Sequence, residues 1–226
     1  MSPIEPIFDK KYECLFCKKP FISKKVRSRF IKVSHFDSDF FPIYQSEDAN
    51  PLHYHIMVCP SCGFSFSEDF SKAFPPGAKE TITHEVCSRW VPHNFSGKRS
   101  IHQAIQTYKL AILCGSLKKE KHITMAGIYM RVGWLYRLLE NQEQEQRFLK
   151  LALKEYEDSL YYGDYTRTQV TEIRLLYLIG EVSRRLNDRQ KAVQYFSQVI
   201  EKQRQSVEPN IIEMARERWR EIRDNS

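Results

Sequence analysis

Two pairs of cysteines dominate the sequence, one at 14–17 (Cys-Leu-Phe-Cys) and one at 59–62 (Cys-Pro-Ser-Cys). A two-residue gap lets one short turn direct both sulfur atoms to the same metal ion, and two such turns supply four thiolates. Gly63 follows the second pair and permits the positive φ with which such a turn closes. We therefore expect a structural Zn²⁺ with bonds of about 2.3 Å to four sulfur atoms, those of Cys14, Cys17, Cys59 and Cys62.

The four sulfur ligands would also suit iron in a rubredoxin-type centre, because the spacing of the cysteines does not select the metal. Zinc is the favoured cofactor and iron the alternative. With all four positions filled by protein, none is open for water, and we expect no catalysis at the metal. The sequence also contains neither a glycine-rich nucleotide motif nor a serine nucleophile elbow. These features predict a binding protein rather than an enzyme.

The composition is that of a soluble globular protein, since the 226 residues are 42% hydrophobic and 28% charged. No apolar run approaches the roughly 20 residues of a membrane span. Residues 1–6 lack the basic and apolar stretches of a secretory signal, so we expect a cytoplasmic protein. Thiols stay reduced in that compartment, and the paired cysteines therefore indicate metal ligands rather than disulfides. We expect Cys87 and Cys114 to be small buried residues.

A change of composition near residue 95 predicts two domains. Most of the ten prolines and all four paired cysteines lie before it, and long stretches without proline follow. We place the boundary at 94–98, with a zinc-binding module at 1–95 and a helical domain at 96–226. The predicted fold class is α+β: a small zinc-ribbon or rubredoxin-like β module followed by an all-α array. The module should contain strands at 26–36 and 53–58, a loop at 37–52 and a helix at 78–91.

The second half predicts six helices, at about 98–117, 122–140, 142–162, 165–186, 188–205 and 209–224. Tetratricopeptide repeats need a small residue where two helices cross, a second small residue twelve positions later and an aromatic residue four further on. Gly180, Ala192 and Phe196 satisfy that spacing. Gly133 begins a second match, in which Glu145 replaces the small residue, and the helix at 98–117 would end a first repeat. A tetratricopeptide-like array is the expectation, and an ordinary helical bundle is the alternative.

The first helices of such repeats line the concave face of the array. Here the predicted first helices at 122–140 and 165–186 carry arginines interspersed with aromatic residues. Arginine forks bind carboxylates and aromatic rings supply contact area, so this mixture fits a protein partner with an acidic peptide. The alternative is that the charges face solvent and the rings lie in the core. The candidate partner-binding residues are Arg131, Trp134, Arg137, Arg174, Tyr177, Arg184 and Arg185.

The net charge of +7 leaves nucleic-acid binding open as a second function. Basic residues between positions 18 and 32 alternate with Phe21 and Phe30, a mixture with which zinc ribbons contact phosphates and bases. A solvated strand edge protected by lysines explains the same residues. Phosphate binding would weaken steeply with salt, whereas burial of an apolar peptide would not. The candidate nucleic-acid contacts are Lys24, Lys25, Arg27, Arg29 and Lys32.

A pair of carboxylates stands at Asp37 and Asp39, among aromatic residues. Paired carboxylates can serve acid–base chemistry. We favour a structural role, in which they turn the chain and pair with Arg27 or Arg29, because no phosphate-binding glycine loop accompanies them.

Two histidine groups also have competing interpretations. His53 and His55 would share one face of the predicted strand at 53–58, as metal-binding or titratable groups or as a partly exposed surface. His84 and Cys87 are one helical turn apart, which permits a second metal site or a nucleophile pair. We favour the exposed surface for the first group and helix packing for the second.

Five short motifs carry a resemblance to a known family. They lie at 12–14 (Tyr-Glu-Cys), 24–27 (Lys-Lys-Val-Arg), 37–40 (Asp-Ser-Asp-Phe), 50–54 (Asn-Pro-Leu-His-Tyr) and 58–63 (Val-Cys-Pro-Ser-Cys-Gly). With them, the chain resembles an uncharacterised bacterial family that has an N-terminal four-cysteine module followed by tetratricopeptide-like helices. The resemblance implies a fold and a bound metal, and it implies no activity.

Overall fold

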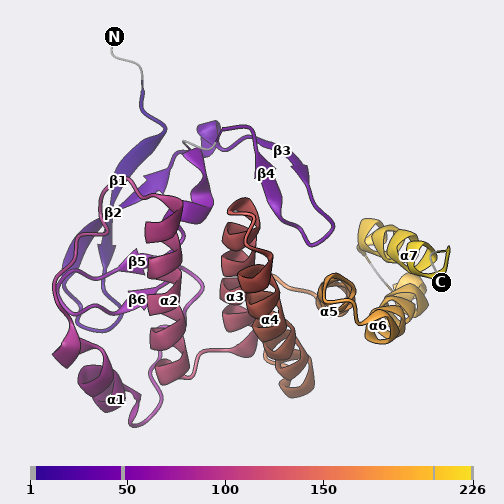
Figure 1. Ribbon diagram of the computed structural model, residues 1–226. Coiled ribbons are helices and arrows are strands. Elements are labelled where there is room, and N and C mark those ends of the chain that lie inside the picture. Colours follow the sequence, from indigo (N-terminus) through magenta and orange to yellow (C-terminus); the bar gives the residue numbers. More distant parts are fainter. Residues whose placement is uncertain (1–3, 47–48, 206, 225–226) are drawn as a thin grey trace. The chain divides into compact units, whose positions relative to one another are not determined.

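The computed structural model describes residues 4–46, 49–205 and 207–224 (Figure 1). The chain forms two compact units. The cysteine unit comprises Met1–His35 and Pro42–Glu120, and the helical unit comprises Phe36–Phe41 and Lys121–Ser226. The described residues are α+β, with short antiparallel strand pairs in the N-terminal part and α-helices after them. None of the helices among the described residues has the length and apolar character that crossing a membrane requires.

Among the described residues, the strands of the N-terminal part form three two-stranded sheets (Figure 1). In the first, β1 (Ile7–Glu13) runs antiparallel to β2 (Pro20–Val26) over the full length of both strands. The second pairs β3 (Val33–Phe36) with β4 (Pro42–Tyr44), and the third pairs β5 (Met57–Val58) with β6 (Ser65–Phe66). Each cysteine pair therefore lies at the turn of a β-hairpin, the first between β1 and β2 and the second between β5 and β6.

Two of the predicted strands are wrong in extent. The segment 26–36 is interrupted by a 3₁₀ turn at Ser28–Phe30, and only Val33–Phe36 is extended after it. The segment 53–58 begins as a 3₁₀ helix at Pro51–Tyr54, because Pro51 fixes a helical φ and the Asn50 side chain accepts the Leu52 N–H at 2.9 Å. The histidines at 53 and 55 consequently do not share a strand face.

The predicted helix at 78–91 is also shorter than expected. α1 spans Ala78–Glu85, and a 3₁₀ turn at Cys87–Arg89 follows it. Ile82 and Val86 are buried, as a packing face requires. His84 is exposed and pairs with Glu85 at 2.9 Å, so its ring is directed along the surface.

The division between the units lies at Glu120, not at the predicted boundary of 94–98. α2 (Ile101–Lys118) packs within the cysteine unit, because its side chains bond to that unit's backbone. The Tyr108 hydroxyl donates to the Leu52 carbonyl at 3.0 Å, and the Cys114 sulfur accepts the Ser65 N–H at 3.3 Å. α2 is therefore not the second helix of a repeat in the helical unit.

Arg99 explains why the predicted linker is part of the cysteine unit. Its side chain is buried, and its guanidinium donates to the carbonyls of Ile56 at 2.7 Å and His53 at 3.1 Å. A third bond reaches the Ser23 hydroxyl at 3.3 Å. Burial lowers the pKa of this guanidinium to about 10. A single cation thus ties the strands and the second hairpin to the start of α2.

The helical unit contains α3 (His122–Leu138), α4 (Gln142–Tyr162), α5 (Glu172–Arg185), α6 (Arg189–Glu201) and α7 (Pro209–Asp224). These bounds agree with the prediction within two residues except at two places: α5 begins after a series of turns rather than at 165, and α6 ends at Glu201, before a 3₁₀ turn at Lys202–Gln205. The residues predicted as breaks cap the following helices: Asn141 accepts the Gln144 N–H, and Asp188 accepts the Lys191 N–H. Short connectors of this kind produce antiparallel pairs, α3 with α4 and α5 with α6 (Figure 1).

Glycines mark the positions where the paired helices approach most closely. A Cβ on Gly180 would lie 2.9 Å from the Phe196 ring, so α5 and α6 can approach only because that side chain is missing. A Cβ on Gly133 would lie 3.4 Å from Leu149 across the α3–α4 pair. Glu145 is tolerated there because its carboxylate turns to Arg137, at 2.7 Å. The tetratricopeptide assignment itself stays a prediction.

α7 completes the core of the helical unit. Its residues Ile211, Ile212, Ala215 and Ile222 are buried against α5 and α6. The opposite face of α7 carries exposed charged residues, as expected of a terminal helix in a helical stack.

Candidate functional site

The two cysteine turns have the same backbone geometry. In the first, the Lys18 N–H donates to the Cys14 carbonyl at 3.0 Å, and in the second the Gly63 N–H donates to the Cys59 carbonyl at 2.9 Å. Lys18 and Gly63 both have positive φ, +62° and +74°. Glycine adopts this conformation without strain, and in the first turn a lysine is held in it.

The four sulfur atoms of Cys14, Cys17, Cys59 and Cys62 all lie within 4.8 Å of one another. The Sγ atoms of Cys14 and Cys62 are 3.7 Å apart, and those of Cys17 and Cys59 are 3.6 Å apart. A tetrahedron with bonds of about 2.3 Å has edges of about 3.8 Å. The geometry therefore fits one metal ion bound by four thiolates, and Cys14 and Cys59 are fully buried.

The thiols interact strongly with one another. The pKa of Cys59 is lowered, first by hydrogen bonds from the thiols of Cys14 and Cys62. The pKa values of those two thiols are raised, chiefly because they donate to neighbouring sulfurs. Without a cation, a thiolate on one sulfur therefore disfavours thiolates on the others. A divalent metal ion allows all four cysteines to be thiolates at once, because its positive charge stabilises each of them.

Aromatic side chains surround the second cysteine turn. Phe64 is fully buried and stacks on Phe16, which lies in the first turn, with ring centroids 5.6 Å apart. The Trp90 ring covers Gly63, where a Cβ would lie 2.5 Å from it, and the Trp90 Nε1–H donates to the Pro60 carbonyl at 3.0 Å. This apolar cover helps to bury three of the four cysteines and leaves Cys17 half-buried, which suits a structural metal.

The remaining cysteines lie close to this centre. Cys114 is fully buried, as predicted, and burial raises the pKa of its thiol to about 12. Cys87 is half-buried, and burial raises the pKa of its thiol while a hydrogen bond with Cys62 opposes that change. The contact with Cys62 has no signal in the sequence spacing, because it depends on how the turn after α1 folds back.

The chain matches a known family over almost all of the given sequence. The profile of a family described as "Uncharacterized protein conserved in bacteria (DUF2225)" matches residues 7–222. The chain belongs to DUF2225. This confirms the family resemblance, and the four clustered cysteines agree with it. No curated protein and no solved structure matches this DUF2225 chain.

The second candidate site of the DUF2225 protein lies in the helical unit, around residues Phe36–Phe41, which we call the acidic segment. The segment is a tight turn, in which the Phe40 N–H donates to the Asp37 carbonyl at 2.9 Å. Asp39 is fully buried, and its Oδ2 accepts from Arg137 Nη2 at 2.7 Å and from Trp134 Nε1 at 3.0 Å. The carboxylates of the segment are thus directed to α3.

Asp37 is bound by two arginines from different helices. Its carboxylate lies 3.0 Å from Arg137 Nη1 of α3 and 2.8 Å from Arg185 Nη2 of α5. Burial alone would raise the pKa of Asp37, but the charge of Arg185 and the Ser38 N–H more than offset it, and the pKa is lowered. The carboxylate therefore stays ionised at neutral pH.

Ser38 connects the segment to a buried carboxylate on α5. Its hydroxyl donates to Glu181 Oε1 at 2.6 Å and accepts from Arg185 Nη2 at 2.9 Å. The Tyr177 hydroxyl donates to the Ser38 carbonyl at 2.8 Å. Glu181 is fully buried and also binds Arg184 Nη2 at 2.7 Å. Side chains of α5 therefore contact both the backbone and the side chain of the segment.

Two aromatic residues complete these contacts. Phe41 is buried and stacks on Trp134, with ring centroids 5.5 Å apart. Phe40 packs on Tyr177 at 5.4 Å, and the guanidinium of Arg174 lies 5.4 Å from the Phe40 ring. The rings and the carboxylates of the segment thus contact the same two helices, α3 and α5.

Six of the seven candidate partner-binding residues contact the acidic segment: Trp134, Arg137, Arg174, Tyr177, Arg184 and Arg185. We call these six residues the arginine face. The seventh, Arg131, donates to the Gly127 carbonyl of its own helix at 2.8 Å. The expected pairing of the two aspartates with Arg27 or Arg29 is wrong, since their partners lie on α3 and α5, roughly a hundred positions or more away in the sequence.

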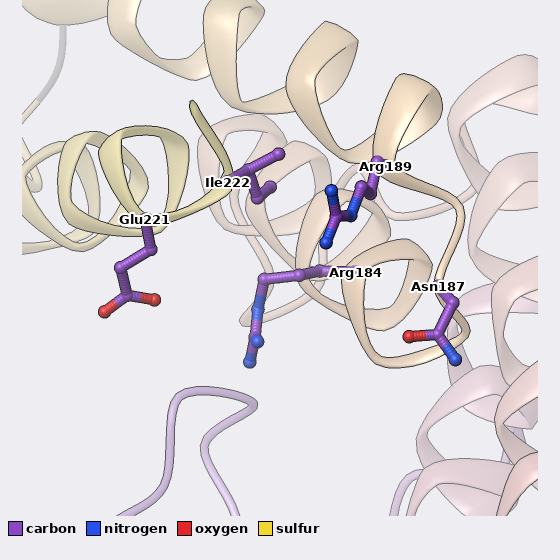
Figure 2. A pocket seen from close by; sticks show the side chains of 5 residues that line it. All are labelled: Arg184, Asn187, Arg189, Glu221 and Ile222. Carbon is purple, nitrogen blue, oxygen red and sulfur yellow. The ribbon is translucent and has the colours of Figure 1, made fainter. Parts of the chain in front are cut away.

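A hollow of about 170 Å³ lies beside the arginine face. Arg184 of α5 belongs to both, because its Nη2 lies 3.5 Å from the Ser38 hydroxyl and its side chain lines the hollow. Figure 2 shows the other lining residues: Asn187 and Arg189 at the α5–α6 connection, and Glu221 and Ile222 from α7. The hollow is open and contains cationic side chains at its wall.

The basic surface proposed for nucleic acid begins on β2 with Lys24 and Lys25, continues past the end of that strand, and is partly neutralised. Lys24 is 2.6 Å from Asp9, and Lys25 is 3.0 Å from Glu68. Arg27 Nε donates to the Glu5 carbonyl at 3.2 Å. Arg29 and Lys32 are exposed. Two of the five candidate cations thus already have carboxylate partners within the cysteine unit.

A group that the sequence analysis missed joins α3 to α4. His122 Nδ1 lies 2.7 Å from Glu155 and 4.0 Å from Asp158. The ring of His122 also stacks on Tyr162, with centroids 5.4 Å apart. A hydrogen bond between His122 and Glu155 that holds the start of α3 against α4 explains these contacts.

Proposed function

We propose that this DUF2225 protein is a zinc-stabilised binding protein without catalytic activity at the metal. In this proposal Zn²⁺ holds the cysteine unit together, and the helical unit presents the arginine face to an acidic peptide of a protein partner. The observation that carries the proposal is the binding of a complete acidic–aromatic segment by α3 and α5, with Asp39 fully buried between Arg137 and Trp134.

The four clustered thiols, of which three are buried and that of Cys17 is half-buried, support zinc as a structural ion. The sulfur set leaves no coordination position for water, and its donors are soft, as zinc requires. When bound, such an ion contributes on the order of 10–16 kcal/mol of apparent binding free energy at neutral pH. Because the ligands must be reduced thiolates, the proposed location is the cytoplasm.

The arginine face supports recognition of carboxylates. Arg137 and Arg185 each use several N–H groups, and such forked contacts are shorter and stronger than neutral hydrogen bonds. α3 and α5 are the first helices of their pairs, the helices that line the concave face if the pairs stack as tetratricopeptide-like repeats. The adjacent hollow adds Arg189, which is exposed and lies at the start of α6.

Affinity capture from the native cell tests this function, with the full-length protein as bait. Arg184 and Arg185 are poor positions for charge reversal because both bind the buried Glu181. Arg189→Glu is the better variant, since an acidic residue in the first turn of α6 is favoured by the helix dipole. Lys150→Glu, on the exposed side of α4, makes the same charge change elsewhere and is the matched control.

We expect Arg189→Glu to lose the captured proteins and Lys150→Glu to retain them. Equal capture by Arg189→Glu and wild type would refute the proposal. Capture of nucleic acid that disappears steeply with salt would instead support the basic surface on β2.

A further inference from the structure

We propose that the acidic segment is a tethered ligand of the arginine face, and that the partner's peptide has the same chemistry. That chemistry is two carboxylates separated by one small residue and followed by aromatic residues. The inference rests on the proposed function and specifies its partner. It also makes the segment a competitor that the partner must displace.

Side chains of α3 and α5 bind the segment as a receptor binds a peptide. Side chains of α3 or α5 bind the carboxylates through arginines, the Ser38 carbonyl through Tyr177 and the Phe41 ring through Trp134. None of these contacts requires the segment to be covalently joined to the helices. A separate peptide with the same groups in the same order would satisfy them equally.

Charge balance shows why an acidic occupant is needed. Without the segment, Arg137, Arg184 and Arg185 contribute three positive charges, and Glu145 and Glu181 contribute two negative ones. One positive charge then remains, and the two negative charges of Asp37 and Asp39 more than offset it. An arginine face without a carboxylate ligand would leave partly buried guanidinium groups poorly paired, which is unfavourable.

Partial exposure and one strained residue make the segment a ligand that a partner can displace. Asp39 and Phe41 are buried, but Phe36 is 63% exposed and the side chain of Asp37 is 37% exposed. Phe40 has a φ of +62°, in the left-handed region that side chains other than glycine rarely adopt. A partner peptide that avoids this conformation would bind without that strain.

Connectivity gives the segment an advantage over any separate peptide. The chain enters it from His35 and leaves it to Pro42, and both neighbours belong to the cysteine unit. A tethered ligand of this kind has an effective concentration in the millimolar range. We therefore expect a separate peptide to bind the wild-type protein weakly, and more tightly once the tethered copy is weakened.

The test uses a fluorescein-labelled peptide of residues 35–42 (His-Phe-Asp-Ser-Asp-Phe-Phe-Pro) and fluorescence anisotropy with the full-length protein. The variant Phe40→Gly removes the ring that packs on Tyr177, and glycine suits the positive φ. Both aspartates stay in place. Phe36→Gly is the matched control, because Phe36 belongs to the same segment and is exposed.

We expect the peptide to bind Phe40→Gly at least tenfold more tightly than it binds wild type or Phe36→Gly. A peptide with asparagine at both aspartate positions should not bind any of the three proteins. Equal affinity for wild type and a folded Phe40→Gly protein would overturn the inference. So would a Phe40→Gly dimer formed by exchange of acidic segments, because the occupant would then be a second copy of the chain.

A measurement on the wild-type protein keeps the inference testable if Phe40→Gly does not fold. The Trp134 indole N–H is bonded to Asp39, so its hydrogen exchange reports release of the segment. We expect it to exchange at least a hundredfold faster than the central backbone amides of α5. Equal exchange rates would show that the segment leaves only when the helices unfold, and the inference would be wrong.

The outcomes separate this inference from the proposed function. If the peptide fails to bind Phe40→Gly while Arg189→Glu still abolishes partner capture, only the identity of the peptide is wrong. If Arg189→Glu captures the same proteins as wild type, the binding function itself is wrong.

Discussion

Replacement of Asp39 by asparagine should destabilise the helical unit more than the same replacement of Asp37. Asp39 is fully buried, and one of its oxygens accepts both Arg137 Nη2 at 2.7 Å and Trp134 Nε1 at 3.0 Å. Asparagine keeps the shape but removes the charge, and its amide group would place one donor against another. If the carbonyl oxygen of asparagine takes the place of Oδ2 and accepts from Arg137 Nη2 and Trp134 Nε1, its NH₂ group faces the Phe41 N–H and Arg137 Nη1, which Oδ1 of Asp39 accepts at 3.2 and 3.3 Å. The reverse orientation places the NH₂ group against Arg137 Nη2 and Trp134 Nε1, so neither orientation satisfies every donor.

The size of the effect follows from what Arg137 retains. Removal of one partner of a buried ion pair costs about 3–5 kcal/mol when the other charge is left unpaired. Arg137 keeps Asp37 at 3.0 Å and Glu145 at 2.7 Å, so its charge is still partly compensated. We therefore expect Asp39→Asn to cost about 2–3 kcal/mol. Asp37→Asn, at a side chain that is 37% exposed, should cost about 0.5–1 kcal/mol.

Denaturant unfolding followed by tryptophan emission measures this difference. A Trp90→Phe background leaves Trp134 and Trp219, both in the helical unit, as the reporters. The larger loss corresponds to a decrease in melting temperature on the order of 10 °C. If Asp39→Asn and Asp37→Asn cost the same, the buried pair with Arg137 does not hold the segment, and the reasoning is refuted. A double-mutant cycle with Arg137→Gln should give a coupling energy of about 1–3 kcal/mol.

Three further predictions concern the metal, the pH response and helix packing. Cys59→Ser should release the bound metal and unfold residues 11–70, as measured by elemental analysis and circular dichroism; an unchanged metal content would contradict the ligand assignment. The pKa of Asp37 is lowered in the folded protein, so its contribution to stability is complete above its unfolded value of about 3.9 and is lost as the pH falls below that value. Asp37→Asn should therefore flatten the acid limb of the stability curve, and an unaltered limb would rule this out. Gly180→Ala should cost about 1–3 kcal/mol because its Cβ would lie 2.9 Å from Phe196. Gly97→Ala, where no atom lies within 4 Å of the added Cβ, should cost much less, and equal losses would disprove the packing argument.

Local signals in the sequence predicted the parts of the structure that depend on local geometry. The cysteine spacing predicted the sulfur cluster because each turn is closed by its own backbone hydrogen bonds. The capping residues and glycines predicted the helices from α3 onward, since caps act within one turn. The strand prediction at 53–58 failed where a local signal was overlooked, the asparagine and proline that begin a 3₁₀ turn at Asn50 and Pro51.

Features that depend on distant partners could not be derived in this way. Arg99 looks like one more basic residue beside a glycine turn, yet its guanidinium binds carbonyls that lie more than forty positions earlier. The assignment of α2 to the cysteine unit depends on similar contacts of Tyr108 and Cys114. The hydrophobic pattern of a helix shows that one face is buried, but it does not identify the element that covers that face.

The arginine face depends both on a local sequence pattern and on a partner that is distant in the sequence. Periodicity placed arginines and aromatic rings on the first helices of the pairs, and charge complementarity then required an acidic ligand. The same sequence contains such a ligand at Asp37 and Asp39, but short-range reasoning assigned it to nearby Arg27 and Arg29. The partners in the structure are Arg137 and Arg185, which are distant in the sequence but have the charge that the aspartates require. When one chain contains an acidic–aromatic loop segment and a cationic–aromatic helix face, the two therefore indicate a ligand and its receptor. They do so even where each alone resembles a surface exposed to solvent.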